Sequence, residues 1–358
     1  MATLTVGSGK DYSTIEAALA ATSAGDTISI DAGTYQEYHL DFYNANLTIK
    51  AADETNPFFG VIMDGLGSTS REYAFWAYAS GTIYQHITMK NFEEYGIRRG
   101  NVAGGSLILS GCLIYGCDGP AISAIGYNSS TQVEIKDSMI IVDEGRAINV
   151  GGNSTVHIHN SVLATNADDE AVLMSSISYP SVTASHCTFI GNGWNGSDGR
   201  HYHLVTQVAK VDNCIVYGGN GHGIQANSHD HNLVYVTHAN SRAYVEFEAS
   251  TYDSDAVSAG TGDLTGDPIF TTAPTQGSIT PGFLNVTLQS SSPAVNAGSS
   301  DFSLDLSGSI RTGDEDIGAF EFIAAVTGYG NKVINIAAAN ISKIINIAKA
   351  DVEKVVGT

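Results

Sequence analysis

Four histidines stand close together in the sequence, and their chemistry is the first to consider. They are His222, His229, His231 and His238. A neutral imidazole can bind Zn²⁺ and can transfer a proton near neutral pH. His229, His231 and His238 offer the residue types of a metal site, but no further ligand stands at a characteristic spacing from them. We therefore expect no metal here, and we expect the stretch to be a turn of a repetitive scaffold.

Charged residues form a second group that could do chemistry. The candidates for catalysis are Asp169, Glu170, His222 and Arg146. Two carboxylates at a suitable separation can divide the acid and base work of glycoside hydrolysis. The short apolar segments align on Ile97, Ile122, Ile148, Val172, Tyr202 and Ile224. This alignment predicts a row made of Arg146, Glu170, Arg200 and His222. An exposed ladder of alternating charges, a glycan-binding face and a hydrolase site all remain open.

Calcium-dependent chemistry would require carboxylates clustered around the cation and an arginine base. The nearest candidates are Asp143, Glu144 and Arg146, although the same stretch is also typical of a turn. We therefore expect no cofactor, with calcium as the alternative.

Aromatic side chains are the remaining indication of a ligand, because their rings stack on sugar faces. Trp194 stands in a turn rich in Gly and Asn, and we expect it to be exposed, whereas we expect Trp76 to be buried. The glycan-binding candidates are Trp194, Arg200, His201, Tyr202 and His203.

The elements that position these residues repeat along the chain. Six segments align so that Cys112, Ser138, Ser161, Cys187 and Cys214 share one column, with spacings of 26, 23, 26 and 27. The preceding column reads Gly111, Asp137, Asn160, His186 and Asn213. A period near 25 with short strands is typical of a solenoid, whose coils bury one continuous core. The first column then predicts a ladder of small inward side chains, and we favour free thiols over a bond between Cys187 and Cys214.

Composition excludes several classes of function. The formal net charge is −21, from 37 acidic and 16 basic residues. Such a surface repels nucleic acids and anionic membranes. The sequence contains no signal peptide, no apolar stretch long enough to span a membrane, and no cysteine spacing typical of zinc sites. We therefore expect a protein made and assembled in a cytoplasm, without nucleic acid partners or membrane insertion.

The two ends of the repeat carry their own signals. Ser13 and Glu16 predict a capping box for a short helix that ends at Gly25. The segment "VGSGKDYSTIEAALAATSAGDTISIDAGTY" resembles the opening of the pectate-lyase-like right-handed parallel β-helix superfamily. "GDPIF", "LQSSSPAVNAGSS" and "RTGDEDIGAFEF" resemble the closing coils of β-helix surface proteins. The resemblance implies an N-terminal cap over residues 1–25 and an all-β, right-handed parallel β-helix over 26–322, but no particular activity.

Part of the charged row resembles polygalacturonases. Asp169-Glu170 is similar to their Asp-Asp pair, and Gly221-His222-Gly223 matches their Gly-His-Gly motif. The sequence departs from that pattern because Glu170 replaces the second Asp and no Arg-Ile-Lys follows His222. The resemblance implies a glycoside hydrolase as one alternative.

The tail, residues 323–358, has a different character. Its residues align at a spacing of 11, which fits a helix with one apolar stripe, while its many Val and Ile residues favour strands equally. "NISKIINI" resembles short repeats at the ends of tailed-phage virion proteins, without their usual glycine. The residues expected to mediate oligomerisation are Ile336, Ile341, Ile344, Ile347, Val352 and Val355. A cap over the last coil is the alternative.

Together these observations favour a structural protein on the surface of a tailed-phage virion, as a tail spike, tail fibre or capsid-surface component. We expect a homotrimer that contacts other virion proteins through the tail and that binds a host-surface glycan. The alternative is an extracellular polysaccharide lyase or glycoside hydrolase with a groove along the β-helix.

Overall fold

The computed structural model covers the whole chain and describes most of residues 1–323. The described residues are 1–55, 58, 60–100, 105–124, 131–150, 154–166, 173–175, 181–191, 202–205, 208–218, 222–226, 228–236, 242–245, 258–275, 279–281, 286–299, 303–311 and 314–323.

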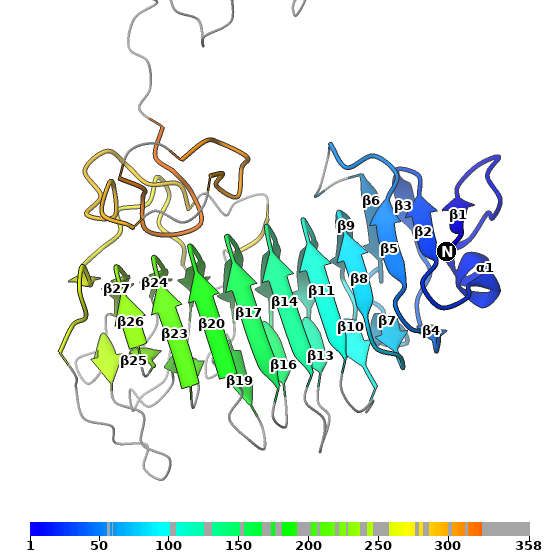
Figure 1. The fold of residues 1–358 in the computed structure, drawn as a ribbon, viewed down its shortest axis with the longest axis horizontal. Helices are drawn as coiled ribbons and strands as arrows, with labels where there is room; N and C mark the ends of the chain where they lie inside the picture. The colour runs from blue at the N-terminus through cyan, green and yellow to red at the C-terminus, as the bar shows by residue number, and fades with distance from the viewer. Residues whose placement is uncertain are drawn as a thin grey trace, which may run out of the picture. The chain divides into compact units, whose positions relative to one another are not determined.

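The described strands form three parallel sheets, and from β2 to β28 successive strands of the chain visit the sheets in turn (Figure 1). Sheet A contains β1 (Thr3–Val6), β2 (Thr27–Ile30), β5 (Thr48–Ala51), β8 (Thr82–Gln85), β11 (Ser106–Ser110), β14 (Gln132–Lys136), β17 (Thr155–His159), β20 (Ser181–Ser185), β23 (Val208–Asp212) and β26 (Ser228–Asp230).

Sheet B contains β3 (Gly33–Tyr35), β6 (Val61–Asp64), β9 (Ile87–Lys90), β12 (Leu113–Cys117), β15 (Met139–Val142), β18 (Val162–Thr165), β21 (Thr188–Ile190), β24 (Ile215–Tyr217), β27 (Leu233–Tyr235) and β29 (Leu264–Thr265). Sheet C contains β4 (Leu40–Phe42), β7 (Tyr73–Ala77), β10 (Tyr95–Arg99), β13 (Ile122–Ala124), β16 (Ile148–Val150), β19 (Leu173–Ser175), β22 (Tyr202–Val205), β25 (His222–Gln225) and β28 (Tyr244–Val245). The protein is a right-handed parallel β-helix, as the repeat predicts.

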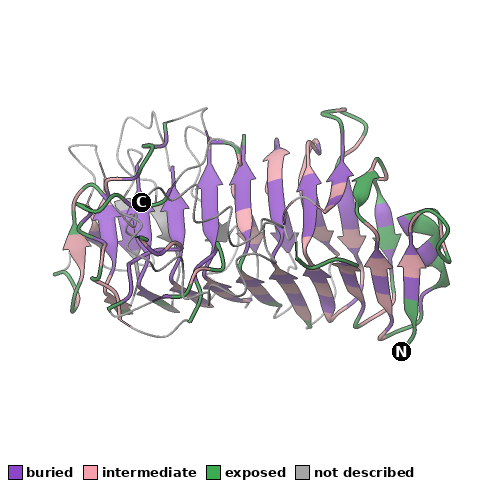
Figure 2. Ribbon diagram, turned by 90° about the horizontal axis from the view of Figure 1, so that it is seen from above, coloured by how far each residue is buried: buried purple, intermediate pink, exposed green. Residues whose placement is uncertain are grey.

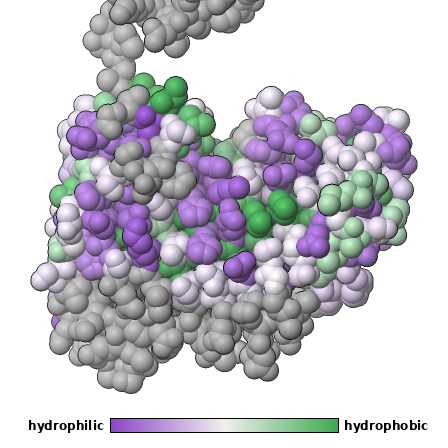
Figure 3. Space-filling model, in the orientation of Figure 1, coloured by the Kyte–Doolittle hydropathy of each residue, from purple (hydrophilic) through white to green (hydrophobic). Residues whose placement is uncertain are grey.

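Side-chain alternation builds the core of the helix. In β11, Leu107 and Leu109 are buried, whereas Ser106 and Ser110 face outward. The neighbouring coils repeat this pattern of buried and less buried residues in register (Figure 2). Equivalent apolar side chains therefore stack along the interior. The outer face of sheet A is largely polar (Figure 3). Each coil is therefore stable only as part of the stack, because its apolar side chains are covered by the coils beside it.

The corner between sheets A and B is a column of left-handed residues. Their φ values lie between +45° and +63°, at His86, Gly111, Asp137, Asn160, His186, Asn213 and His231. Glycine adopts this conformation without strain, and Asn, Asp and His are the other types enriched in it. The column of Gly, Asp, Asn and His in the sequence therefore reports the backbone geometry of the corner.

The next residue at each of these corners points inward, as predicted. Cys112, Ser138, Ser161, Cys187 and Cys214 are all buried. The backbone N–H of Cys112 donates to Ser138 Oγ at 3.1 Å, and the N–H of Ser138 donates to Ser161 Oγ at 3.2 Å. All four cysteines are buried free thiols. The small side chains thus connect neighbouring coils without a disulfide.

The N-terminal end differs in detail from the prediction. Helix α1 spans Ile15–Ala21, and its N-cap is Thr14, whose side chain accepts from Ala17, in place of Ser13. The two oxygens of Glu37 accept the first helical N–H groups, from Ile15 at 2.9 Å and Glu16 at 2.8 Å. Strand β1 precedes the helix and pairs with β2, so the first strand of the β-helix lies inside the predicted cap. A distant carboxylate caps the helix, which local sequence does not reveal.

The described residues between Gly266 and Phe322, here called the C-terminal strap, contain no strand of the three sheets. The prediction of closing coils is therefore wrong for these residues. The strap packs on the outer face of sheet B and forms a second apolar cluster with it. The cluster includes Phe270, Ile279, Leu288, Ala294 and Ile317 of the strap and Ile141, Ala164, Ile190 and Ile215 of the sheet.

Buried charges anchor the strap. Arg311 lies 3.6 Å from Glu321 within the strap, and its guanidinium donates to Asn160 Oδ1 of the corner column at 3.3 Å. His186 Nε2, from the corner column, lies 2.8 Å from Glu315 Oε2, and both side chains are almost completely buried. Breaking such a pair leaves an uncompensated buried charge, so these contacts specify where the strap lies.

The chain divides into two compact units, Met1–Phe322 and Ile323–Thr358. Residues 324–358, and with them all six predicted oligomerisation residues, lie outside the described residues.

Candidate functional site

The structure tests the predicted charged row through its backbone register. Ile148 pairs with Leu173 and Leu173 pairs with Leu204, where the sequence alignment used Val172 and Tyr202. The alignment was therefore wrong by one residue and then by two. His222 of β25 pairs with Tyr202 of β22, so Arg200 is not its neighbour in register. The number of residues between β18 and β19 differs from that between β21 and β22, and periodicity alone does not reveal the resulting shift in register.

Several predicted site residues lie outside the described residues, namely Asp169, Glu170, Trp194, Arg200 and His201. Tyr202, His203 and His222 are described only as backbone of β22 and β25. Arg146 is half-buried on the turn before β16. The polygalacturonase-like arrangement of Asp169, Glu170 and His222 therefore stays a prediction.

His229 belongs to the scaffold. Its Nδ1 lies 2.5 Å from Asp263 Oδ2, and its ring stacks on Tyr244 with 4.8 Å between centroids. Asp263 also accepts the backbone N–H groups of Gly260 and Asn232. Burial by itself would raise the pKa of Asp263, but the hydrogen bonds from His229 and these N–H groups lower it overall. This carboxylate therefore fixes the turn before β29.

His231 Nδ1 lies 2.8 Å from Asp230 Oδ1, and His238 lies outside the described residues. Within the described part of the chain, no group of three or more His, Cys, Asp or Glu residues is arranged to hold a metal ion. The same part contains no helix that is long and apolar enough to cross a membrane.

A polar cleft lies where the chain leaves sheet B for sheet C. It has a volume of about 240 Å³ and is lined by Gly67, Ser68, Thr69, Asn91, Phe92, Glu93, Gly116, Asp118 and Asp143. Except for Gly116 of β12, these residues come from the turns that precede β7, β10, β13 and β16. We call this the acidic cleft, because three of its lining residues are carboxylates.

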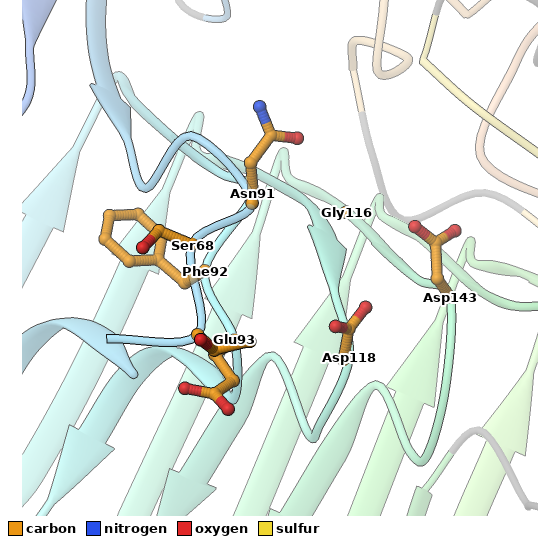
Figure 4. A pocket seen from close by; sticks show the side chains of 9 residues that line it. Ser68, Asn91, Phe92, Glu93, Gly116, Asp118 and Asp143 are labelled. Atoms are coloured by element: carbon orange, nitrogen blue, oxygen red, sulfur yellow. The ribbon is translucent and has the colours of Figure 1, made fainter. Parts of the chain in front are cut away.

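The carboxylates occupy equivalent positions on successive coils. Cys117 pairs with Val142, and the N–H of Asp143 donates to the carbonyl of Cys117 at 3.2 Å. Asp118 and Asp143 are therefore neighbours in the stack, and both are exposed. Their side chains extend toward the same side, whereas the carboxylate of Glu93 points away from them (Figure 4). None of the three forms an ion pair with a described basic residue.

One wall of the acidic cleft is a rigid turn after β6. Asp64 accepts the N–H of Leu66 at 2.9 Å and the side-chain N–H of Asn91 at 3.0 Å, and it lies 3.1 Å from Lys90 Nζ. Burial opposes ionisation, but these contacts keep the pKa of Asp64 below its ordinary value. A Cβ on Gly65 would lie only 2.3 Å from the backbone oxygen of Asn91, so only glycine fits there. The wall is thus preorganised.

Asn166 connects Asp143 of the acidic cleft to the strap. Its side-chain N–H group donates to Asp143 Oδ1 at 2.9 Å and to the carbonyl of Ile279 at 3.1 Å. The N–H of Ile279 donates back to Asn166 Oδ1 at 3.3 Å. The strap therefore fixes the side chain that orients Asp143, a relation between residues more than a hundred positions apart in sequence.

Aromatic side chains gather on the outer face of sheet C. One of them is Trp76, for which the prediction of a buried side chain is wrong. Trp76 is half-buried and stacks on Tyr78 with 4.7 Å between centroids. Tyr78 also stacks on Tyr43 at 4.7 Å, and the guanidinium of Arg98 lies 4.0 Å from the Trp76 ring. We call these four side chains the aromatic stack. Trp76 stays at the surface because its strand alternates, and the inward position goes to Phe75.

Comparison with known proteins assigns the fold. The crystal structure of pectate lyase Pel9A aligns with 90% of this chain and 96% of its own, at a TM-score of 0.53 and 13% sequence identity. A pectin methylesterase from Aspergillus niger aligns with 72% of this chain and 90% of its own, with 17% identity and a lower TM-score of 0.39. No family model and no curated protein matches the sequence. The protein therefore has the pectate-lyase-like β-helix fold, at an identity too low to transfer an activity.

Proposed function

We propose that this protein cleaves a polysaccharide, with Asp118 and Asp143 as the acid and base pair of the acidic cleft. The observation that carries this proposal is their position at equivalent sites of adjacent coils, extending to the same side of an open cleft. Adjacent strands are about 4.8 Å apart, so side chains at equivalent positions of adjacent coils can bring their carboxyl groups to a similar separation. Retaining glycosidases hold their two carboxyl groups about 5–5.5 Å apart.

The surroundings suit this role. The exposed hydroxyl of Thr69 and the half-buried side chains of Ser68 and Asn91 provide hydrogen-bonding groups for sugar hydroxyls. Asn166 holds one oxygen of Asp143 in place, whereas Asp118 has no hydrogen bond to a described side chain. The two carboxylates therefore have different environments, as a division between acid and base requires. A pectate lyase shares the fold, which is compatible with a polysaccharide substrate.

The test is an assay of the purified protein on a panel of neutral and acidic polysaccharides, with measurement of reducing ends and of absorbance at 235 nm. We expect new reducing ends, and we expect Asp118→Asn and Asp143→Asn each to lower kcat by about 10²–10⁴-fold. Asp137→Asn is the matched control, because it neutralises an exposed carboxylate at another corner. Products that absorb at 235 nm would indicate a lyase instead. No turnover on any substrate, or full turnover in both variants, would contradict the proposal.

Binding without cleavage is the second candidate function. The apolar repeats of residues 323–358 favour attachment to a larger assembly, such as the surface of a tailed-phage virion. In that role the protein would be a homotrimer that binds a host-surface glycan. Retention on a glycan without turnover, together with trimers in solution, would support this function over hydrolysis.

A further inference from the structure

The aromatic stack ends in a ring with one open face. Tyr78 stacks on both Tyr43 and Trp76, and Trp76 lies between Tyr78 and Arg98. Tyr43 stacks on Tyr78 with an interplanar angle of 13°, and yet it is 71% exposed. With one face covered, such exposure requires that the opposite face is in contact with solvent. Tyr43 follows β4, which is the edge strand of sheet C, so no strand of that sheet covers it.

The stack holds this exposed ring in place. Tyr43 follows Phe42, which pairs with Ala77, so the rings of Tyr43 and Tyr78 lie on adjacent coils. The guanidinium of Arg98 extends the stack onto a third coil, because Arg98 pairs with Trp76. A ring fixed in this way loses little conformational freedom when a ligand binds to it. An exposed tyrosine without such neighbours would lack this advantage.

A hydrogen-bond acceptor accompanies the open ring. Asp41 is exposed and lies two residues before Tyr43, on the same outer face of the chain. Its Oδ1 accepts the hydroxyl proton of Tyr73 at 3.0 Å, which fixes the carboxylate. An ionised carboxylate accepts several hydrogen bonds, so Asp41 retains acceptor capacity for hydroxyl groups of a ligand.

We infer that the open face of Tyr43 binds a pyranose unit of an uncharged polysaccharide, with Asp41 accepting its hydroxyl groups. An apolar C–H face of a pyranose stacks on an aromatic ring, and its rim of hydroxyls meets the acceptor beside that ring. A polyuronate is disfavoured, because Asp41 lies beside the ring and the chain carries a net charge of −21. This inference rests on the proposed function, and it names the substrate class as neutral.

The position of Tyr43 makes it an anchor and separates it from catalysis. The acidic cleft lies on the turns that lead into β7, β10, β13 and β16, whereas the stack lies at the end of β4 and on the outer face of β7 and β10. The two sites therefore share strands but not residues. Only a polymer is long enough to contact Tyr43 and the acidic cleft at the same time. Short oligosaccharides therefore gain less affinity from Tyr43.

The experiment measures binding with the full-length Asp118→Asn protein, so that cleavage does not interfere. Affinity electrophoresis is run in gels that contain neutral β-glucan, xylan or polygalacturonate. We expect retardation in at least one neutral gel and none in polygalacturonate. Tyr43→Ala should raise the Kd for that neutral glycan about tenfold. Tyr43→Phe should bind like the parent, because the ring is kept. Tyr235→Ala is the control, since Tyr235 stacks on Tyr217 of sheet B, away from this site.

Equal retardation of the parent and Tyr43→Ala would overturn the inference, as would stronger binding to polygalacturonate. Absence of binding to every neutral glycan, or Tyr43-dependent binding of a quaternary ammonium ligand alone, would also overturn it. Turnover measured separately with the unmodified protein keeps the two proposals distinct. Binding without turnover contradicts only the catalytic proposal, and turnover without Tyr43-dependent binding contradicts only this inference.

Discussion

At the scale of single residues, buried or half-buried carboxylates determine the shape of several turns. Asp64, Asp263 and Glu37 each accept two or more backbone or side-chain N–H groups. Backbone groups outside regular strands need such partners, because an unsatisfied buried N–H group is costly. His229 of the histidine-rich stretch has the same kind of partner, since its Nδ1 donates to Asp263.

We predict that Asp263→Asn lowers the free energy of unfolding by about 1–3 kcal/mol at neutral pH. The two carboxylate oxygens of Asp263 accept hydrogen bonds from His229 and Asn232. In the Asn variant an NH₂ group replaces one of these oxygens, so one of the two donors loses its acceptor. Because the pKa of Asp263 is lowered in the folded protein, its stabilisation is complete above the ordinary Asp pKa of about 3.9 and is lost as the pH falls through the lower folded value.

Thermal unfolding of both proteins between pH 7 and pH 2.5 checks this prediction. The difference between them should shrink below about pH 4. A difference that stays constant down to pH 2.5 would show that the charge of Asp263 contributes nothing.

At the scale of elements, the corner column decides how β-strands of sheet A pass into sheet B. From the β8–β9 corner to the β26–β27 corner, the described coils turn through one residue in the left-handed region, and the residue that follows is buried and at five of the seven corners is Cys or Ser. The turn is therefore encoded by the residue types Gly, Asn, Asp and His, because other side chains are strained there.

We predict that Asp137→Val destabilises the protein by about 1–2 kcal/mol more than Asp137→Gly does. Both variants lose the hydrogen bond from Asn160, at 2.8 Å, so their difference isolates the cost of a φ of +50° for a β-branched residue. Chemical denaturation of the two variants measures this difference. Equal stabilities would mean that the corner relaxes out of the left-handed region.

At the scale of the whole molecule, the unit Met1–Phe322 contains the β-helix and the strap that packs on sheet B. The strap contributes apolar side chains, the Arg311 and Glu315 contacts, and the backbone that fixes Asn166. The orientation of Asp143 in the acidic cleft therefore depends on the strap, although the residues that line the cleft come from the first half of the chain.

We predict that truncation after Phe322 leaves this unit folded and removes self-association. The far-UV circular dichroism should keep its β signal, because the two apolar clusters of this unit are built from its own residues. Sedimentation velocity should show an oligomer for the full chain and a monomer for the truncated one, since apolar side chains repeated along the tail are typical of an interface. If the truncated chain kept the oligomeric state of the full chain, the tail would not mediate self-association, and the alternative of a cap over the last coil would be favoured.

Local sequence alone determined the repeat. Leu107 and Leu109 are buried and their neighbours in β11 are not, which depends only on the strand pleat. The corner column that contains Asn160 depends only on allowed φ values. Each coil obeys the same local rules, so the fold class was predictable from one sequence. The same rules did not predict the register of β19 and β22, because the lengths of the preceding turns are not periodic.

The candidate site was decided by tertiary structure. Asp118 and Asp143 become a pair because adjacent coils stack, and Asn166 orients Asp143 because Ile279 returns to it from the strap. Tyr43 has an open ring face because β4 is the edge strand of its sheet. Sequence periodicity reports which side of a strand a residue occupies. It does not report which distant segment covers that side, because such packing depends on contacts between residues far apart in the chain.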